Sequence, residues 1–109
     1  MPATYEILGQ ISPTANTLTN VFITGASSSA IVGTITIHNF SDSNASYSLV
    51  VRPSAVTLNT QHFLIRGGVL PARELITITG AVTMNANTIL AANTNSGSVS
   101  FNAYGVEIS

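Results

Sequence analysis

The chain has 109 residues, which suits one domain with a single modest core, and only 6% of them are charged, against about 25% in a typical soluble protein. It contains no lysine and no cysteine, and its formal net charge is −1, so it lacks the basic surface needed to bind nucleic acid and cannot form disulfides or thiolate metal sites. Its hydrophobic fraction of 45% excludes a highly charged disordered chain, and we expect residues 1–109 to fold as a single domain.

Alternation of apolar and polar residues with a period of two predicts β-strands along most of the chain. In residues 30–39, Ile31, Ile35 and Ile37 share one face, and threonines and His38 share the other. The alternation recurs in segments 46–52, 62–66, 74–80 and 99–103. Turn-forming residues divide the chain at 12–16, 25–29, 41–44, 53–55, 67–68, 71–72, 85–87 and 93–97. About eight or nine short strands at this spacing predict an all-β fold, an antiparallel sandwich that is jelly-roll-like or immunoglobulin-like.

The alternation changes phase near the C-terminus. Val99 and Phe101 occupy odd positions, whereas Tyr104 and Val106 occupy even ones. One extra residue near Gly105 would bring both pairs to the same face of the sheet, so we expect a β-bulge there.

Signals for helices are few. Segments 53–61 and 69–73 are the only ones that leave room for a helical turn. No run of apolar residues is long enough to span a membrane, and no basic segment precedes an apolar core at the N-terminus. We therefore expect neither a membrane-spanning helix nor a secretory signal.

The two histidines are the first candidates for a chemical site. His38 and His62 each fall on the polar face of a predicted strand, and only Asp42 and Glu74 could join them as metal ligands. A zinc site needs three or four ligands that further hydrogen bonds hold in place. We therefore interpret both histidines as ordinary, half-exposed residues.

The three arginines are the only side chains of the Lys and Arg type in the chain. Arg73 follows Pro71 and precedes Glu74, which fits either an ion pair at an interface or a solvated strand end, and we favour the second because exposed pairs contribute little stability. Arg52 and Arg66 fall at the ends of predicted strands. Since arginine is enriched and lysine depleted in protein interfaces, a set without lysine slightly favours contacts with a partner.

Motifs for catalysis are absent. The chain has no Gly-x-Ser-x-Gly turn, its Gly67-Gly68 pair lacks the lysine and helix of a phosphate loop, and no carboxylates are spaced for acid–base chemistry. We expect no catalytic, cofactor-binding or metal-binding residue, no cofactor and no enzymatic activity. Asn39-Phe40-Ser41 and Asn44-Ala45-Ser46 match the glycosylation pattern, as chance predicts in a chain rich in Asn and Ser. The Phe and Tyr residues are spread over the strands, as core anchors would be, rather than grouped into a carbohydrate-binding platform.

The order of several strand-like pieces suggests a family. These pieces are Ile35-Thr36-Ile37-His38-Asn39, Gln61-His62-Phe63-Leu64-Ile65, Pro71 followed by Leu75-Ile76-Thr77-Ile78-Thr79-Gly80, Val82-Thr83-Met84, and the ending Val99-Ser100-Phe101-Asn102-Ala103-Tyr104-Gly105-Val106-Glu107-Ile108. With 8–10 and 18–22, they resemble the small structural proteins of tailed-bacteriophage virions that are common among phages of cyanobacteria and other aquatic bacteria. Segment 85–96 departs from the family pattern, with more Asn and fewer large apolar residues.

The resemblance implies a β-sandwich that belongs to a phage virion. We expect first a capsid cement or decoration protein, which would bind the particle surface and bridge neighbouring subunits. The alternatives are a small tail or baseplate component, or a fibre-tip module that binds a carbohydrate or receptor. The expected partners are capsid or tail proteins of the same virion and further copies of the chain, with a trimer as one option for the homo-oligomer; nucleic acid and membranes are not expected partners.

The low charge also leads to a prediction about strand edges. β-Proteins normally guard exposed edges with lysine or other charges, and this chain has few of them. We therefore expect its edge strands to be short, paired or covered. For contacts with partners we expect the termini and the loops 41–45, 53–60 and 85–96.

Overall fold

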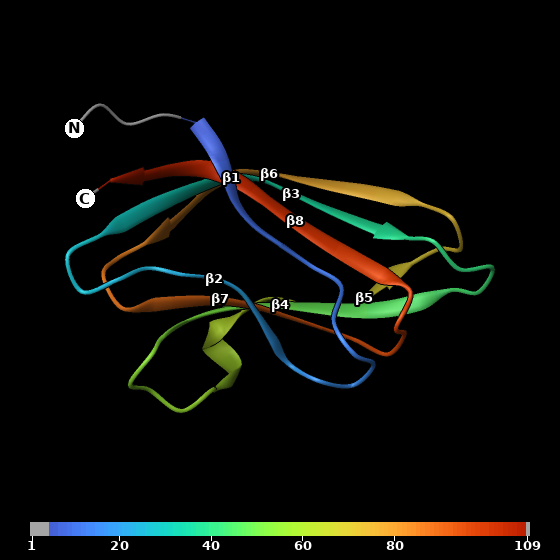
Figure 1. Ribbon diagram of the computed structural model, residues 1–109. Helices are drawn as coiled ribbons and strands as arrows, with labels where there is room; N and C mark the ends of the chain where they lie inside the picture. The colour runs from blue at the N-terminus through green and yellow to red at the C-terminus, as the bar shows by residue number, and fades with distance from the viewer. Residues whose placement is uncertain (1–4, 109) are drawn as a thin grey trace.

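The computed structural model describes residues 5–108 as eight strands and one short 3₁₀ helix (Figure 1). The elements are β1 (Tyr5–Ile11), β2 (Thr19–Ile23), β3 (Ser29–Asn39), β4 (Ala45–Pro53), η1 (Thr60–His62), β5 (Phe63–Leu70), β6 (Leu75–Met84), β7 (Thr88–Thr94) and β8 (Val99–Ile108). The helical turn η1 falls at the end of one of the two segments that left room for it. No helix in this described part of the chain is long and apolar enough to cross a membrane.

The strands form two antiparallel sheets of four that pack face to face, which confirms the predicted β-sandwich (Figure 1). Sheet A has the strand order β1-β8-β3-β6, and sheet B has the order β2-β7-β4-β5. Every connection except that from β4 to β5 crosses from one sheet to the other. Strands that are consecutive in the chain therefore lie mostly in opposite sheets, and the last strand, β8, lies inside sheet A between β1 and β3.

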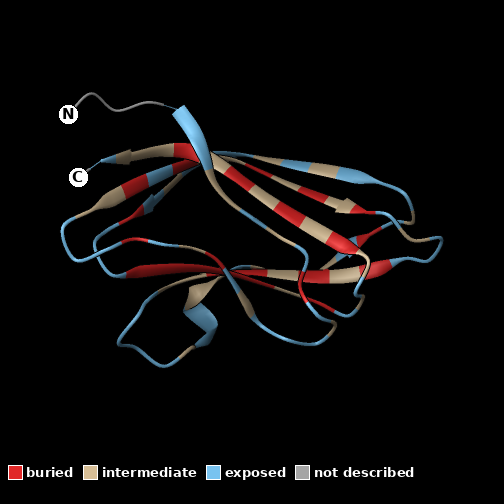
Figure 2. Ribbon diagram, in the orientation of Figure 1, coloured by how far each residue is buried: buried red, intermediate tan, exposed pale blue. Residues whose placement is uncertain are grey.

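The core lies between the two sheets. Buried and half-buried residues alternate along β8, where Val99, Phe101 and Ala103 are fully buried (Figure 2). Both sheets contribute large side chains that are completely buried, among them Phe101, Ile35, Ile37, Leu49, Leu70, Met84 and Leu90. Since burying one such side chain contributes roughly 1.5–3 kcal/mol, this layer supplies the main stabilisation of the sandwich.

The change of phase occurs in β3 rather than in β8, so the predicted bulge at Gly105 is wrong. β8 keeps its alternation through Gly105, which is buried. The register of β3 against β8 shifts between Val32 and Thr34, so that Gly33 is the extra residue. Because of this bulge Ile31 points away from the core, whereas the later isoleucines of β3 are buried. The assignment of Ile31 to the core face was therefore wrong as well.

Two glycines occur where backbones press together. A Cβ atom at Gly105 would overlap the carbonyl oxygen of Ile31 beside the β3 bulge. A Cβ atom at Gly9, which follows a register shift in β1, would overlap the carbonyl oxygen of Val21 in β2. Strand β1 of sheet A and strand β2 of sheet B thus approach closely enough to close one rim of the sandwich.

The opposite rim, formed by β5 and β6, is open. These strands have eight and ten residues, and no described part of the chain pairs with their outer edges. Val69 of β5 is 68% exposed, Leu75 of β6 is 57% exposed, and Arg66 is the only charged residue of the two strands. The expectation that every edge strand is short, paired or covered is therefore wrong for the isolated chain, and low charge alone gives no argument for assembly.

The segment 54–62 folds over the outer face of sheet B, where Figure 1 shows η1 beside the sheet. Val50 of β4 and Ala91 of β7 are paired neighbours that point away from the main core, yet they are 0% and 1% exposed. The segment covers this small second apolar cluster. Arg52 of β4 holds it in place, because its Nη1 donates to the carbonyl of Val56 at 2.8 Å.

Candidate functional site

The two histidines lie on different elements, His38 in β3 of sheet A and His62 in the 3₁₀ helix η1, and they do not form a site. His38 lies on the outer face of sheet A, with its ring centroid 6.1 Å from that of Phe40. His62 lies in η1 rather than on a strand, and its Nδ1 accepts the backbone N–H of Asn59 at 2.9 Å. Among residues 5–108, no three Asp, Glu or His side chains come together as metal ligands.

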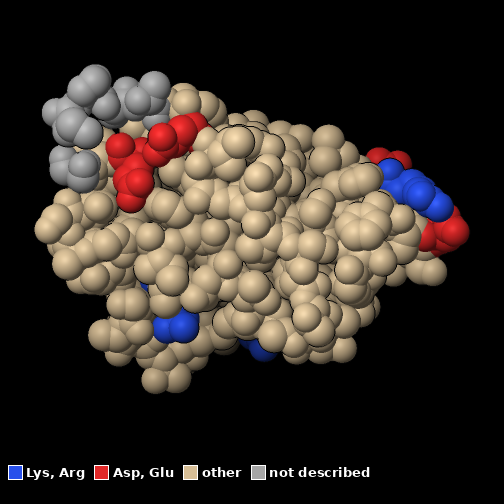
Figure 3. Space-filling model, in the orientation of Figure 1, with Lys and Arg blue, Asp and Glu red and all other residues tan. Residues whose placement is uncertain are grey.

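Charged atoms gather at the two ends of the molecule and along its lower side, and the visible surface between them is uncharged (Figure 3). At one end, Nε of Arg73 donates to Oδ1 of Asp42 at 2.8 Å, and the two side chains are 65% and 85% exposed. Arg73 therefore pairs with Asp42 of the neighbouring turn and not with Glu74. An ion pair this exposed contributes about 0–1 kcal/mol, as expected for a solvated strand end.

The other two arginines make contacts within the chain. The guanidinium of Arg66 lies 5.0 Å from the ring centroid of Phe63, a cation–π contact. Arg66 lies within β5 and not at its end, because the strand continues through Gly67-Gly68, where the sequence predicted a break. Arg52 holds the segment 54–62, as described above, and its Nε is buried without a hydrogen-bond partner.

Replacing Arg52 by methionine should loosen the segment 54–62. The variant loses the hydrogen bond to Val56 but keeps much of the packing of the side chain, so we expect the free energy of unfolding to fall by about 1 kcal/mol. Amide hydrogen exchange in 54–62 should become faster. Arg73→Met, at the far end of the molecule, is the control and should leave that exchange unchanged; equal exchange in both variants would contradict the assigned role of Arg52.

Asn39 is a structural residue at the end of β3 and not a glycosylation site. It is 0% exposed. Its Nδ2 donates to the carbonyls of Ser43, Leu70 and Pro71 at 2.8, 3.2 and 3.3 Å, and its Oδ1 accepts the backbone N–H and the hydroxyl of Ser41 at 3.0 and 2.8 Å. This one side chain therefore ties the β3–β4 turn of the sandwich to the β5–β6 turn.

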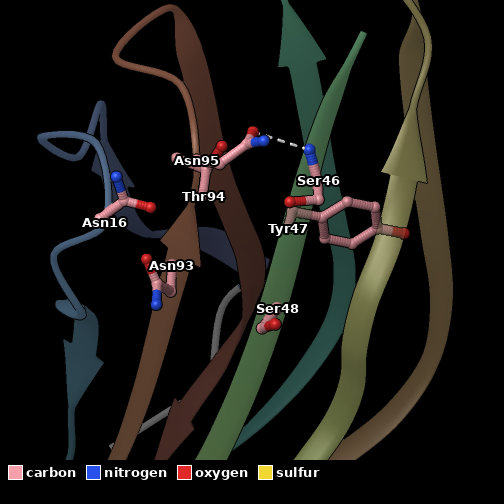
Figure 4. Close-up of a pocket in the computed structure, with 7 residues that line it drawn as sticks. All are labelled: Asn16, Ser46, Tyr47, Ser48, Asn93, Thr94 and Asn95. Atoms are coloured by element: carbon pink, nitrogen blue, oxygen red, sulfur yellow. Dashed lines mark hydrogen bonds between the residues drawn. The ribbon is translucent and has the colours of Figure 1, made fainter.

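A small polar hollow lies on sheet B beside the loop 12–18 (Figure 4). Its volume is about 100 Å³, and it is lined by Asn16, Ser46, Tyr47, Ser48, Asn93, Thr94 and Asn95. Oδ1 of Asn95 accepts the Ser46 N–H at 2.9 Å, and Oδ1 of Asn93 is buried without a hydrogen-bond partner. The hollow is several times smaller than small-molecule pockets, which measure roughly 300–1,000 Å³. It suits bound water rather than a sugar ring.

The aromatic residues divide between core and surface, so their prediction as core anchors is correct only in part. Phe101 and Tyr47 are buried, at 0% and 6% exposure. Tyr5 and Phe40 are instead 59% and 45% exposed. Tyr5 lies on the outer face of sheet A, where its hydroxyl is hydrogen-bonded to the Thr34 hydroxyl at 3.0 Å.

The outer face of sheet A carries an apolar patch that sequence reasoning missed. The register aligns Tyr5, Val106 and Ile31 in one row across β1, β8 and β3, with Ile7 beside Tyr104 in the next row. Tyr5 and Ile7 are each 59% exposed, and Ile31 is 42% exposed. With Ile108 at 47% exposure, these residues form what we call the sheet A patch: Tyr5, Ile7, Ile31, Tyr104, Val106 and Ile108. The only signal in the sequence was the break in alternation, which had been placed at Gly105.

The loops expected to contact partners differ in their exposure. The turn 41–44 and the segment 53–60 are mostly exposed. Segment 85–96, in contrast, consists mainly of β7, a buried strand between β2 and β4, so it is wrong as a contact loop, and only the turns on either side of that strand reach the surface. Residues 1–4 and 109, the termini expected to make contacts, lie outside the described residues.

Comparison with known proteins finds a shared fold. This chain is similar to a chain in the acid-stable capsid structure of Helicobacter pylori bacteriophage KHP30, with a TM-score of 0.54 and 12% sequence identity. The match covers 98% of this chain and 93% of that chain. No family model and no curated protein sequence matches. The chain thus has the fold of a domain that occurs, from end to end, in a phage capsid structure.

Proposed function

We propose that this protein is a structural component of a phage virion, and specifically a cement or decoration protein on the capsid. The observation that carries the proposal is the end-to-end likeness to a chain of a phage capsid structure, at 98% and 93% coverage. The resemblance of its strand segments to small virion proteins supports the same function, although at 12% identity to that capsid chain each argument rests on pattern and fold rather than on shared functional residues.

The strand order further supports a virion role. We infer that the orders β1-β8-β3-β6 and β2-β7-β4-β5 are those of a jelly roll, the eight-stranded double sheet that recurs in viral capsid proteins. The crossing of almost every connection between the sheets agrees with this assignment. Jelly rolls also occur in lectins and cupins, so the topology supports the proposal only together with the capsid likeness.

The proposed mechanism is contact area rather than chemistry. A cement protein stabilises a shell by bridging neighbouring subunits, and many copies repeated by symmetry add their contributions. The expected partners are the capsid proteins of the same virion and further copies of this chain.

Adding the purified chain to capsids that lack it should test the proposal. We expect saturable binding with a fixed number of copies per capsid, together with a rise in the temperature at which the capsid opens. A soluble β-sandwich of similar size from an unrelated source is the control and should do neither. Binding to isolated tails instead of capsids would favour the tail-associated alternative, and absence of binding to either would reject a virion role.

A further inference from the structure

The outward positions of sheet A carry no Asp, Glu or Arg, although Glu6 and Glu107 alternate with patch residues along β1 and β8. These outward positions follow from the register: Tyr5, Ile7 and Gln10 on β1; Ser100, Asn102, Tyr104, Val106 and Ile108 on β8; Ser29, Ile31, Thr34, Thr36 and His38 on β3; and Leu75, Thr77, Thr79 and Thr83 on β6. None of them is Asp, Glu or Arg. Most of the apolar residues gather at one half of this outer face, beside Thr83, whereas the other half carries threonines, Asn102, His38 and the exposed Leu75.

The Tyr5 side chain is anchored within the sheet A patch. The Tyr5 side chain reaches from β1 across the sheet to β3, where its hydroxyl meets Thr34 at 3.0 Å and its ring lies over Gly33. A Cβ atom at Gly33 would come within 2.9 Å of that hydroxyl. The same bulge turns Ile31 outward, which is a recurrent use of bulges beside functional surfaces. A fixed surface loses little conformational freedom when it is buried, so it favours association.

The size of the face matches a protein interface. Strands lie about 4.8 Å apart and rise about 3.3 Å per residue, so four strands of about ten residues present roughly 600 Å² in projection. The accessible surface of a pleated face exceeds its projection, and stable interfaces bury about 800 Å² per partner. A partner that covers the whole outer face of sheet A, and not the sheet A patch alone, therefore buries about what a stable complex needs.

We propose that the partner is a second copy of this chain, packed face to face on the sheet A patch about a two-fold axis. A charged partner surface would lose its hydration here without gaining an ion pair. A second copy brings the same neutral apolar patch, and two-fold symmetry places one patch on the other. This inference deepens the proposed function, since it makes the decoration protein a dimer and leaves sheet B and its covering segment for other contacts.

Sedimentation of the full chain and two charge variants should test the interface. We expect the wild-type chain to sediment at twice the mass of one copy at tens of micromolar. Ile31→Lys places a charge in the patch and should weaken association at least about tenfold. Val69→Lys, at a site that is 68% exposed on β5 and outside the patch, is the matched control and should leave the dimer intact. Circular dichroism should show both variants folded, because both sites are exposed.

A cross-link can locate the axis. Val106 lies at the centre of the patch, between Tyr5 and Ile31 across the sheet, and the chain has no cysteine of its own. Under mild oxidation Val106→Cys should form a disulfide-linked dimer, while Val69→Cys should not. A wild-type monomer, a dimer that Ile31→Lys leaves intact, or a trimer that Val106→Cys cannot cross-link would overturn the proposal.

The capsid experiment separates this inference from the proposed function. A monomer whose binding to capsids is abolished by Ile31→Lys would assign the patch to the capsid, which overturns the dimer and keeps the decoration role. A patch-dependent dimer that binds neither capsids nor tails would keep the dimer and reject the virion role.

Discussion

Replacing Gly105 by alanine is expected to lower the free energy of unfolding by about 3 kcal/mol or more. The added methyl group would overlap the carbonyl oxygen of Ile31, a backbone atom in the neighbouring strand that no rotamer change can move. Gly105 lies in β8, which pairs with both β1 and β3, so a shift to relieve the overlap would disturb two strand pairs. Chemical denaturation followed by circular dichroism measures the loss.

Gly97→Ala provides the matched control, because nothing lies within 4 Å of a Cβ atom at that position. We expect it to change the free energy of unfolding by less than about 0.5 kcal/mol. Equal stability of the two variants would mean that β3 and β8 are not pressed together at the bulge, and the account of why Ile31 faces outward would then fail.

Replacing Asn39 by alanine is expected to cost about 2–4 kcal/mol. The change leaves the carbonyls of Leu70 and Pro71 without the amide that now binds them in a buried site, and it removes the acceptor of the Ser41 N–H. Because these groups belong to the two turns that the buried Asn39 side chain joins, alongside the exposed contacts of Asn44 with Ala72 and of Asp42 with Arg73, both turns should become more mobile. Thermal unfolding and hydrogen exchange at 41–44 and 70–73 would measure the two effects.

Asn20→Ala removes the same amide from an exposed position on β2 and should leave stability within about 0.5 kcal/mol of the wild type. If Asn39→Ala behaved like Asn20→Ala, the Asn39 side chain would not be buried in its network.

Period-two patterning predicts the class and number of strands because most strands here are buried on one face only. It fails for β7, which is rich in alanine and asparagine and therefore resembles a loop. Ala91, on the outward face of that strand, is buried because the segment 54–62 covers it. No local pattern specifies such a cover, since it depends on where a distant segment comes to lie.

The position of the β-bulge is a second feature that the sequence pattern does not specify. Sequence parity reveals that two halves of the sheet are out of phase, but it does not reveal which of two paired strands carries the extra residue. Gly105 was the expected site, whereas Gly33 of β3 holds it. Which of the two strands carries the bulge decides whether Ile31 faces the core or the surface, and therefore whether the sheet A patch exists.

The burial of Asn39 is a third feature that the sequence pattern does not specify. Its amide binds carbonyls 31 and 32 residues away along the chain, so its burial depends on two turns meeting in the folded sandwich. In the sequence alone, Asn39 is recognisable only as part of a match to the glycosylation pattern, which is Asn, any residue and Ser.

The place of β8 in sheet A constrains how the protein is made. Among the described strands, β1 pairs with β8 alone, yet β8 is synthesised after the other seven strands. At about 5–20 residues per second, β1 waits several seconds with its ladder groups unpaired, and sheet A cannot close before β8 has been made. Pairing the two ends of the chain also makes folding slow relative to helical proteins of this size. Loss of the last ten residues would therefore not fray one edge but would remove the strand that joins β1 to β3 in sheet A.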